Sequence, residues 1–188
     1  MTKLLLASKS PRRRELLATL GIPFAVVDIN VDEHFDVLPP ADKVAESLAE
    51  RKSEGYGAHL QPDEILVTAD TVVVLDNQVL GKPHDRLQAV AMLKALSGHT
   101  HYVYTGVCLR SDAGRRSFTE CTKVCFRALS DEDIAYYVDN FKPYDKAGAY
   151  GIQEWIGYIA MTDMRGSFYN VMGFPVHRVY DMLLRFIG

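Results

Sequence analysis

The sequence predicts an α/β fold whose strands run in mixed directions. Apolar, β-branched segments alternate along the 188 residues with segments in which leucine and alanine recur at helical spacing. Two of the strand-like segments double back through short polar turns, after residue 75 and near residue 112, so neighbouring strands there are antiparallel. No internal repeat, low-complexity stretch or linker interrupts this pattern, and we therefore predict a single domain over residues 1–188.

The first half of the chain contains five predicted elements. Residues 3–8 (KLLLAS) read as a short buried strand that runs into a helix. That helix begins at Ser10-Pro11, a side-chain cap followed by a residue whose missing N–H costs nothing there, and Gly21 ends it. The other three elements are a strand over 24–29, a helix over 40–57 opened by Pro40, and a central strand over 64–75.

The second half continues with a turn at DNQ (76–78), which leads the central strand back into VLGKP. A helix with a glycine stop follows over 86–98, and residues 99–129 are predicted to form two long strands around an Asp-Ala-Gly-Arg turn. Ser130 caps a helix over 130–141 whose first turn is acidic, as the helix dipole favours. An amphipathic helix over 175–188 closes the chain.

Composition narrows the class of protein. A net charge of -3 leaves no broad positive surface for nucleic acid, so affinity for anions must be local. Cys108, Cys121 and Cys125 form no CxxC pair, and we expect reduced, part-buried thiols. The start MTKLLLASKSPRRR is too short in apolar residues for a signal peptide, and no apolar run reaches the length of a membrane span. We expect a soluble, cytoplasmic protein without a nucleic-acid or membrane partner.

Three arginines occupy the first turn of the first helix, where the dipole disfavours cations. At roughly 100° per residue, Arg13 falls on the same face as Leu16, Leu17 and Leu20, with Arg12 and Arg14 on either side. A helix N-terminus offers free N–H groups to anions, and a guanidinium adds a fork for phosphate oxygens. Arg13 is therefore a candidate phosphate ligand; the alternative is a solvated basic patch, which is our interpretation of Arg14.

A lysine and an aspartate lie where apolar side chains are expected. Lys52 sits within the apolar face of the 40–57 helix, although a lysine there can also extend its ammonium to water. Asp70 interrupts the apolar strand ILVTADTVVV and needs a partner or a metal, although aspartates that serve structure at strand ends are common. Lys82 returns on the second arm of the same hairpin. One carboxylate among several inward cations is the set that binds a polyphosphate and activates water.

Other patterns point to function less specifically. His99 and His101 have the spacing of metal ligands but no third ligand nearby, so packing is the simpler interpretation. Cys121 and Cys125 share one strand face, which also indicates packing. GRRS (114–117) lies at a hairpin tip and is expected to be solvated. The chain has no Walker A motif and no GxGxxG, which disfavours P-loop and dinucleotide-binding folds.

Taken in order, several motifs resemble the Maf family of nucleoside triphosphate pyrophosphatases over essentially the whole chain. They are ASKSPRRRELL, AERK, ADTVVVLDNQVLGKP, SGHTHYVYTGV, and DKAGAYGIQ followed by GSFYNVMGFPV. The resemblance implies an elongated mixed sheet with helices in two lobes around a central cleft, a Maf/ITPase-like fold. It also implies hydrolysis of a nucleoside triphosphate between the α and β phosphates with Mg²⁺ or Mn²⁺, and a homodimer.

The resemblance assigns roles by motif position. Asp70 matches the proton acceptor that activates water, and Glu33 matches an acidic residue for metal or catalysis, so these two are the expected metal ligands. The residues matched to phosphate binding are Ser8, Arg13, Lys52 and Lys82, and we count Lys82 with the catalytic group. Ser8 and Glu33 enter through the resemblance alone.

The segment AGAYGIQE resembles the dTTP/UTP branch of the family, with Arg12, Thr71 and Gln153 at the positions tied to base specificity. A glutamine amide can donate to a pyrimidine oxygen and accept from N3–H. Glu154 departs from the glycine usual in that branch and bears on loop conformation or substrate range. The alternatives are a 7-methyl-GTP pyrophosphatase of the same family and a non-enzymatic nucleotide-binding regulator of cell division.

Overall fold

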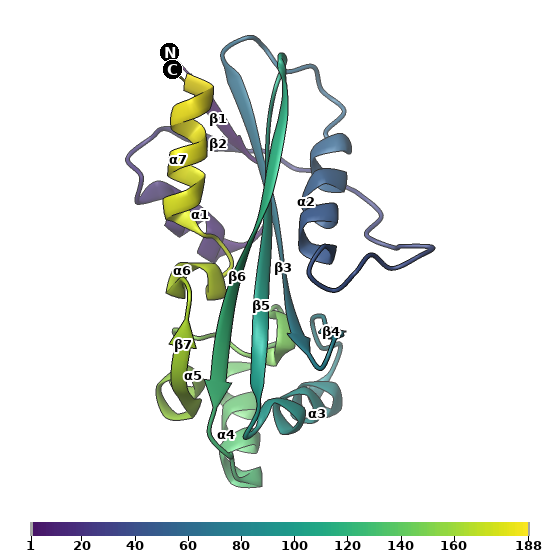
Figure 1. The fold of residues 1–188 in the computed structure, drawn as a ribbon, viewed down its shortest axis with the longest axis vertical. Helices are drawn as coiled ribbons and strands as arrows, with labels where there is room; N and C mark the ends of the chain where they lie inside the picture. Colours follow the sequence, from purple (N-terminus) through teal and green to yellow (C-terminus); the bar gives the residue numbers. More distant parts are fainter. Residues whose placement is uncertain (1, 188) are drawn as a thin grey trace. The chain divides into compact units, whose positions relative to one another are not determined.

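The computed structural model describes residues 2–187, whose backbone forms a seven-stranded mixed sheet with helices (Figure 1). The strands are β1 (Lys3–Leu6), β2 (Phe24–Val26), β3 (Glu64–Leu75), β4 (Gln78–Leu80), β5 (Thr100–Ser111), β6 (Gly114–Phe126) and β7 (Met161–Arg165). The helices are α1 (Pro11–Ala18), α2 (Val44–Glu54), α3 (Arg86–Leu96), α4 (Asp131–Phe141), the 3₁₀ turn η1 (Ala147–Ala149), α5 (Trp155–Ala160), α6 (Phe168–Val171) and α7 (Val176–Ile187).

The sheet has the strand order β2-β1-β3-β5-β6-β7, with β4 paired to β3. Strand β1 runs parallel to both neighbours, with Leu5 opposite Ala25 on one side and opposite Leu66 on the other. Strand β4 is antiparallel to β3, and β7 is antiparallel to β6. These pairings confirm the predicted α/β class with mixed strand directions.

The hairpin between β3 and β4 turns through Asp76 and Asn77, which have φ angles of 47° and 65°. Two successive positive φ values match the right-handed twist of the flanking strands, and Asp and Asn tolerate them better than most residues. The predicted glycine stop after α1 is also confirmed, since Gly21 has a φ of 67°. The turn chemistry that the sequence displays therefore sets where these elements end.

The chain divides into two compact units, and the first comprises the described residues up to Asp70, Thr105–Glu120 and those from Gly173 onward. Within it, α1 and α7 lie on one side of the strands and α2 on the other (Figure 1). The close approach of α2 requires Gly106 in β5, because a Cβ there would collide with the backbone of Ala45. This unit contains Glu33 and Asp70, two of the residues predicted to be catalytic.

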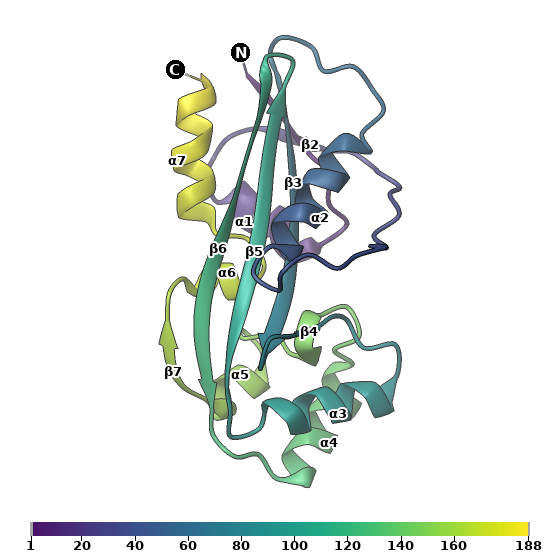
Figure 2. The same cartoon turned by 45° about the vertical axis from the view of Figure 1, so that its right-hand side comes forward.

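The second unit comprises Thr71–Tyr104 and Cys121–Met172. Figure 2 shows α3 and α4 side by side in it, and two ion pairs join these helices, Arg86–Asp139 at 2.6 Å and Lys94–Asp131 at 2.8 Å. Its core is a continuous cluster of buried apolar side chains drawn from α3, α4, α5 and the strands between them. The acidic first turn of α4 forms the predicted capping box with Ser130.

Several predicted elements differ from those observed. Helix α2 begins at Val44 and not at Pro40, because residues 40–43 form a turn in which the Lys43 N–H donates to the Pro40 carbonyl at 2.7 Å. Strand β2 spans three residues of the predicted 24–29. The elements α5, β7 and α6 were not predicted, since residues 155–171 show neither helical nor strand periodicity over a useful length.

The three cysteines are free thiols, as predicted. Cys108 is buried and Cys125 half-buried, but Cys121 is exposed, contrary to the expectation that all three are part-buried. Residues 114–116 of the hairpin tip predicted to be solvated at 114–117 are exposed, but Ser117 is half-buried and its hydroxyl donates to Glu50. Within residues 2–187, no helix combines the length and apolar character needed to cross a bilayer.

Candidate active site

The start of α1 places Arg13 inward. The Ser10 side chain caps the helix by accepting from the Arg13 N–H, and Pro11 occupies the first helical position. Arg13 is half-buried and its Nε donates to the Gly173 carbonyl at 2.9 Å, whereas Arg14 is exposed. The predicted separation of these two arginines by helical periodicity is therefore confirmed.

Arg13 is close enough to two carboxylates for their charges to act on it. Burial lowers the pKa of the Arg13 guanidinium, as does the neighbouring Arg12, while the negative charges of Asp70 and Glu33 oppose that shift. The guanidinium stays charged at neutral pH, because the ordinary pKa of arginine lies far above neutrality. The helix start thus brings a permanent cation to Asp70.

Asp70 lies in the middle of β3, and the packing of α2 on this strand supplies its partner. The Thr68 hydroxyl donates to the Ala49 carbonyl at 2.6 Å. Asp70 is two residues further along the same face of the strand, and Lys52 is three residues further along α2. Lys52 Nζ accordingly donates to Asp70 Oδ1 at 2.5 Å, and each of the two side chains is 14% exposed.

Lys52 Nζ also contacts Glu33 Oε1 at 3.0 Å, so that one ammonium is shared by two carboxylates. Glu33 is more open than its partners, with 55% of its side chain exposed. The structure therefore brings together Glu33, Lys52 and Asp70 in direct contact, with Arg13 acting on both carboxylates through its charge.

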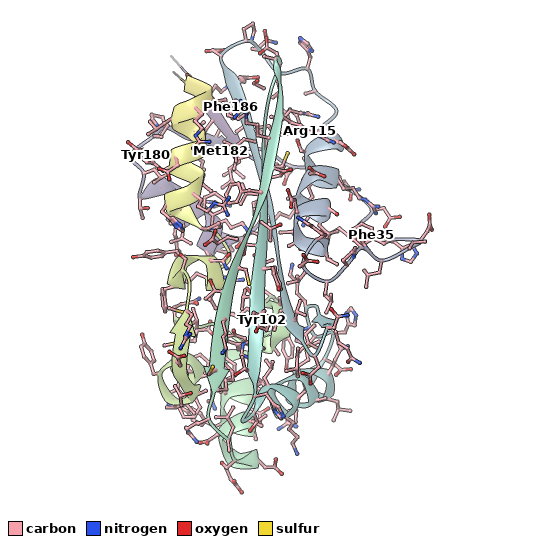
Figure 3. The ribbon with its side chains drawn as sticks, in the orientation of Figure 1. Phe35, Tyr102, Arg115, Tyr180, Met182 and Phe186 are labelled. Atoms are coloured by element: carbon pink, nitrogen blue, oxygen red, sulfur yellow. The ribbon has the colours of Figure 1, made fainter. Side chains whose placement is uncertain are left out.

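The loop that carries Glu33 is held against α2 by Arg51. Its guanidinium donates to the backbone carbonyls of Asp32 and His34, on either side of Glu33. The same guanidinium lies 4.2 Å from the centre of the Phe35 ring, which Figure 3 shows in this loop beside α2. Arg51 and Lys52 thus bind consecutive parts of one loop. Sequence patterns did not single out Glu33, because a loop has no periodicity. The signal that could have found it is the pair of adjacent cations, Arg51 and Lys52, which require acidic partners.

Ser8 is buried directly before α1, and its Oγ accepts a hydrogen bond from the Ser10 N–H at 3.2 Å. This bond uses a lone pair and not the hydroxyl hydrogen, which leaves a donor to offer to an anion at the helix start. Sequence patterns did not single out Ser8, because a serine before a helix is ordinarily interpreted as a local cap.

Of the remaining predicted residues, Arg12 is half-buried in α1 of the first unit, and the other three belong to the second unit. Thr71 is half-buried and follows Asp70 in β3, so its side chain points to the opposite face. Lys82 is exposed after β4, and the preceding Gly81 carbonyl accepts from the Gly148 N–H at 3.0 Å. The Gln153 side-chain oxygen is buried without a hydrogen-bond partner among residues 2–187. An acceptor left in this state is suited to a ligand donor.

Of the two histidines with metal-ligand spacing, His101 serves packing as predicted, whereas His99 is exposed. His101 is fully buried, its Nε2 bonds the Tyr150 hydroxyl at 2.8 Å, and its ring meets those of Tyr150 and Phe126 edge to face. Burial lowers the pKa of His101 to about 4. His99 instead directs Nδ1 to the Ser97 carbonyl. Over residues 2–187, no group of three or more His, Cys, Asp or Glu side chains is arranged to hold a metal ion.

The family model and the curated relatives match almost the full length of the chain. The family model described as Maf-like protein matches residues 3–186. A dTTP/UTP pyrophosphatase of Bacteroides thetaiotaomicron is 48% identical over 182 residues, covering 96% of this chain and 94% of that protein. One of Porphyromonas gingivalis is 50% identical over 189 residues, covering 98% and 94%. A solved structure of a nucleoside-triphosphatase / dITP/XTP pyrophosphatase from Mycobacterium abscessus is also similar. It has 16% identity and a TM-score of 0.42, and the match covers 68% of this chain and 76% of that one.

Proposed function

This chain belongs to the Maf family, as the match over residues 3–186 shows, and we propose on that premise that it hydrolyses dTTP and UTP to the monophosphate and pyrophosphate. The family resemblance predicted from the sequence motifs is thereby confirmed. The chain is a nucleoside triphosphate pyrophosphatase, and its two relatives named above carry the dTTP/UTP specificity in their names.

The observation that carries the proposal is the contact between Lys52 and Asp70, on which the half-buried Arg13 also acts through its charge. The carboxylate of Asp70 is the proton acceptor for the attacking water, whose oxygen forms the new bond to phosphorus as pyrophosphate leaves. Lys52 neutralises Asp70 at 2.5 Å. Triphosphate oxygens compete for the same ammonium, and Asp70 is then left to take the proton.

Phosphate binding is assigned to four residues, each by its own chemistry. Arg13 offers its guanidinium at the start of α1, where Ser8 adds a hydroxyl donor. Lys52 supplies an ammonium that two carboxylates already hold in place. Lys82, exposed after β4, is the cation we assign to the departing pyrophosphate.

A divalent cation fits the donor set. Glu33 and Asp70 are drawn to one positive charge, and Mg²⁺ is commonly held by one or two carboxylates while substrate phosphates complete its shell. These two residues would hold Mg²⁺ or Mn²⁺, which when bound supplies charge neutralisation of the polyphosphate.

Base recognition is assigned to Gln153, with Thr71 and Arg12 as the further specificity residues. The buried, unpartnered oxygen of Gln153 can accept the N3–H of uracil or thymine, while the amide nitrogen donates to a ring oxygen. Cytosine lacks this N3–H, so the same amide discriminates against it.

The test is pyrophosphate release from a panel of dTTP, UTP, CTP, GTP and 7-methyl-GTP with Mg²⁺ or Mn²⁺. We expect turnover of dTTP and UTP above the others. Activity confined to 7-methyl-GTP would transfer the chain to the other branch of the family. Binding without hydrolysis of any triphosphate would favour the regulator. A homodimer and a cytoplasmic location stay predictions; sedimentation velocity tests the first, and cell fractionation the second.

A further inference from the structure

A buried lysine, Lys146, and its two carboxylate partners lie in the segment around Gln153 and have no role in the chemistry above. Lys146 is 9% exposed, and its Nζ contacts Asp145 Oδ1 at 2.8 Å and Glu154 Oε1 at 3.0 Å. Burying an ammonium in this way is costly unless its partners are well placed. The ion pair with Lys146 therefore fixes the carboxylate of Glu154, the residue that follows Gln153.

The second oxygen of Glu154 is bound to the fold through Tyr137 of α4. The Tyr137 hydroxyl donates to Glu154 Oε2 and accepts from the Gly151 N–H at 3.0 Å. Burial and the adjacent carboxylate raise the pKa of Tyr137, so the hydroxyl remains a donor throughout the physiological range. One side chain of a rigid helix thus connects both ends of the turn 151–154.

The backbone at Gly151 is also closely packed against these side chains. A Cβ on Gly151 would lie 2.9 Å from Glu154 Cδ and 3.0 Å from Lys146 Cε, so the backbone passes directly against the two charged side chains. The Glu154 N–H also donates to the Gly151 carbonyl at 3.0 Å. Gln153 is the residue directly before Glu154 in a turn fixed by side chains as well as backbone.

Glu154 stands directly before α5. Glutamate is not among the residues that usually cap a helix start, and the Glu154 side chain makes no capping bond to the first turn of α5. Its carboxylate is bound instead by Lys146 and Tyr137.

We propose that Glu154 is a positioning residue for base recognition, and that it acts through Tyr137 and Lys146 to orient the amide of Gln153. The inference rests on the proposed function, in which that amide reads uracil or thymine. An amide distinguishes uracil from cytosine only if its oxygen and nitrogen face fixed places. Loosening the turn therefore lowers discrimination more than it lowers the hydrolysis of a bound triphosphate.

The experiment measures kcat and KM for UTP and CTP in wild type, Glu154→Gln, Tyr137→Phe and Gln153→Ala, and in Gln153→Ala combined with Glu154→Gln. Tyr137→Phe removes a single hydroxyl and serves if Glu154→Gln folds poorly. We expect Glu154→Gln and Tyr137→Phe to reduce the UTP-to-CTP ratio of kcat/KM about fivefold, the effect of about one hydrogen bond, mainly through KM for UTP. In the Gln153→Ala background, Glu154→Gln should change that ratio no further.

Asp139→Asn is the matched control, because it removes a carboxylate of the same unit that pairs with Arg86. It should leave the ratio unchanged. Glu154 variants that keep the wild-type ratio, or lower it equally with and without Gln153, would overturn the inference. A Gln153→Ala variant with the wild-type ratio would also overturn it, since Glu154 is argued to act through that amide. Absence of UTP turnover in wild type would instead overturn the proposed function.

Discussion

Replacing Asp70 by Asn separates proton transfer from nucleotide binding. The amide keeps an oxygen at the position that Lys52 contacts at 2.5 Å, but it cannot take a proton from water. Loss of a general base lowers rates by about 10²–10⁴-fold, or about 3–5 kcal/mol at the barrier. We therefore expect kcat for UTP to fall at least about a hundredfold.

Nucleotide affinity should respond differently. Asp70 competes with phosphate oxygens for the ammonium of Lys52, and a neutral amide competes less. The Kd for a non-hydrolysable UTP analogue, measured without divalent cation so that the proposed metal role of Asp70 does not enter, should therefore stay equal or fall. Because Lys52 keeps Glu33 as a partner, the unfolding free energy should drop by about 1 kcal/mol only.

The assay is single-turnover hydrolysis of UTP together with calorimetric titration of the analogue. Glu64→Gln is the matched control, since Glu64 lies on the same strand and pairs with Lys3 at 2.9 Å. It should retain the wild-type kcat. An Asp70→Asn variant with kcat within threefold of wild type would refute the reasoning. A variant whose lower kcat/KM comes entirely from a higher Kd for the nucleotide would refute it as well.

Three further perturbations follow from contacts outside the reacting groups. The pKa of His101 is lowered from 6.5 to about 4, so its contribution to stability is complete above pH 6.5 and is lost as the pH falls through 4, by about 3 kcal/mol; urea unfolding at pH 7 and 4.5 should show a smaller loss in His101→Asn, and equal losses would contradict this cause. Arg51→Gln should speed amide exchange around Glu33 about threefold, because two backbone bonds and a ring contact are removed; unchanged exchange would mean that the loop holds itself. Ser130→Ala should lower the unfolding free energy by about 1 kcal/mol with UTP hydrolysis intact, and loss of activity would contradict a purely structural cap.

Sequence reasoning located the residues whose environment contradicts their chemistry. Asp70 stands out because an unbroken apolar strand surrounds it, and Arg13 and Lys52 because periodicity places them with leucines and alanines. The structure supports each of these inferences with a specific contact. Such signals are local, because they depend only on the neighbours of a residue within its own helix or strand.

What sequence reasoning could not find depends on contacts distant along the chain. Glu33 is placed by Arg51 and Lys52, almost twenty residues later, and nothing periodic marks its loop. Glu154 looked like an added charge with an effect on the loop, but its partners lie in α4 and before η1, so its neutralisation appears only in three dimensions. The short elements after residue 154 were missed because tertiary packing, and not intrinsic pattern, forms them.

The ammonium shared by Glu33 and Asp70 has a consequence for the end of the catalytic cycle. A lysine that binds polyphosphate with no other anion nearby is left uncompensated when the product departs, and this holds the product back. Here two carboxylates contact Lys52 Nζ. Departure of the product then exchanges one anion for another at the same nitrogen, and no bare charge is exposed.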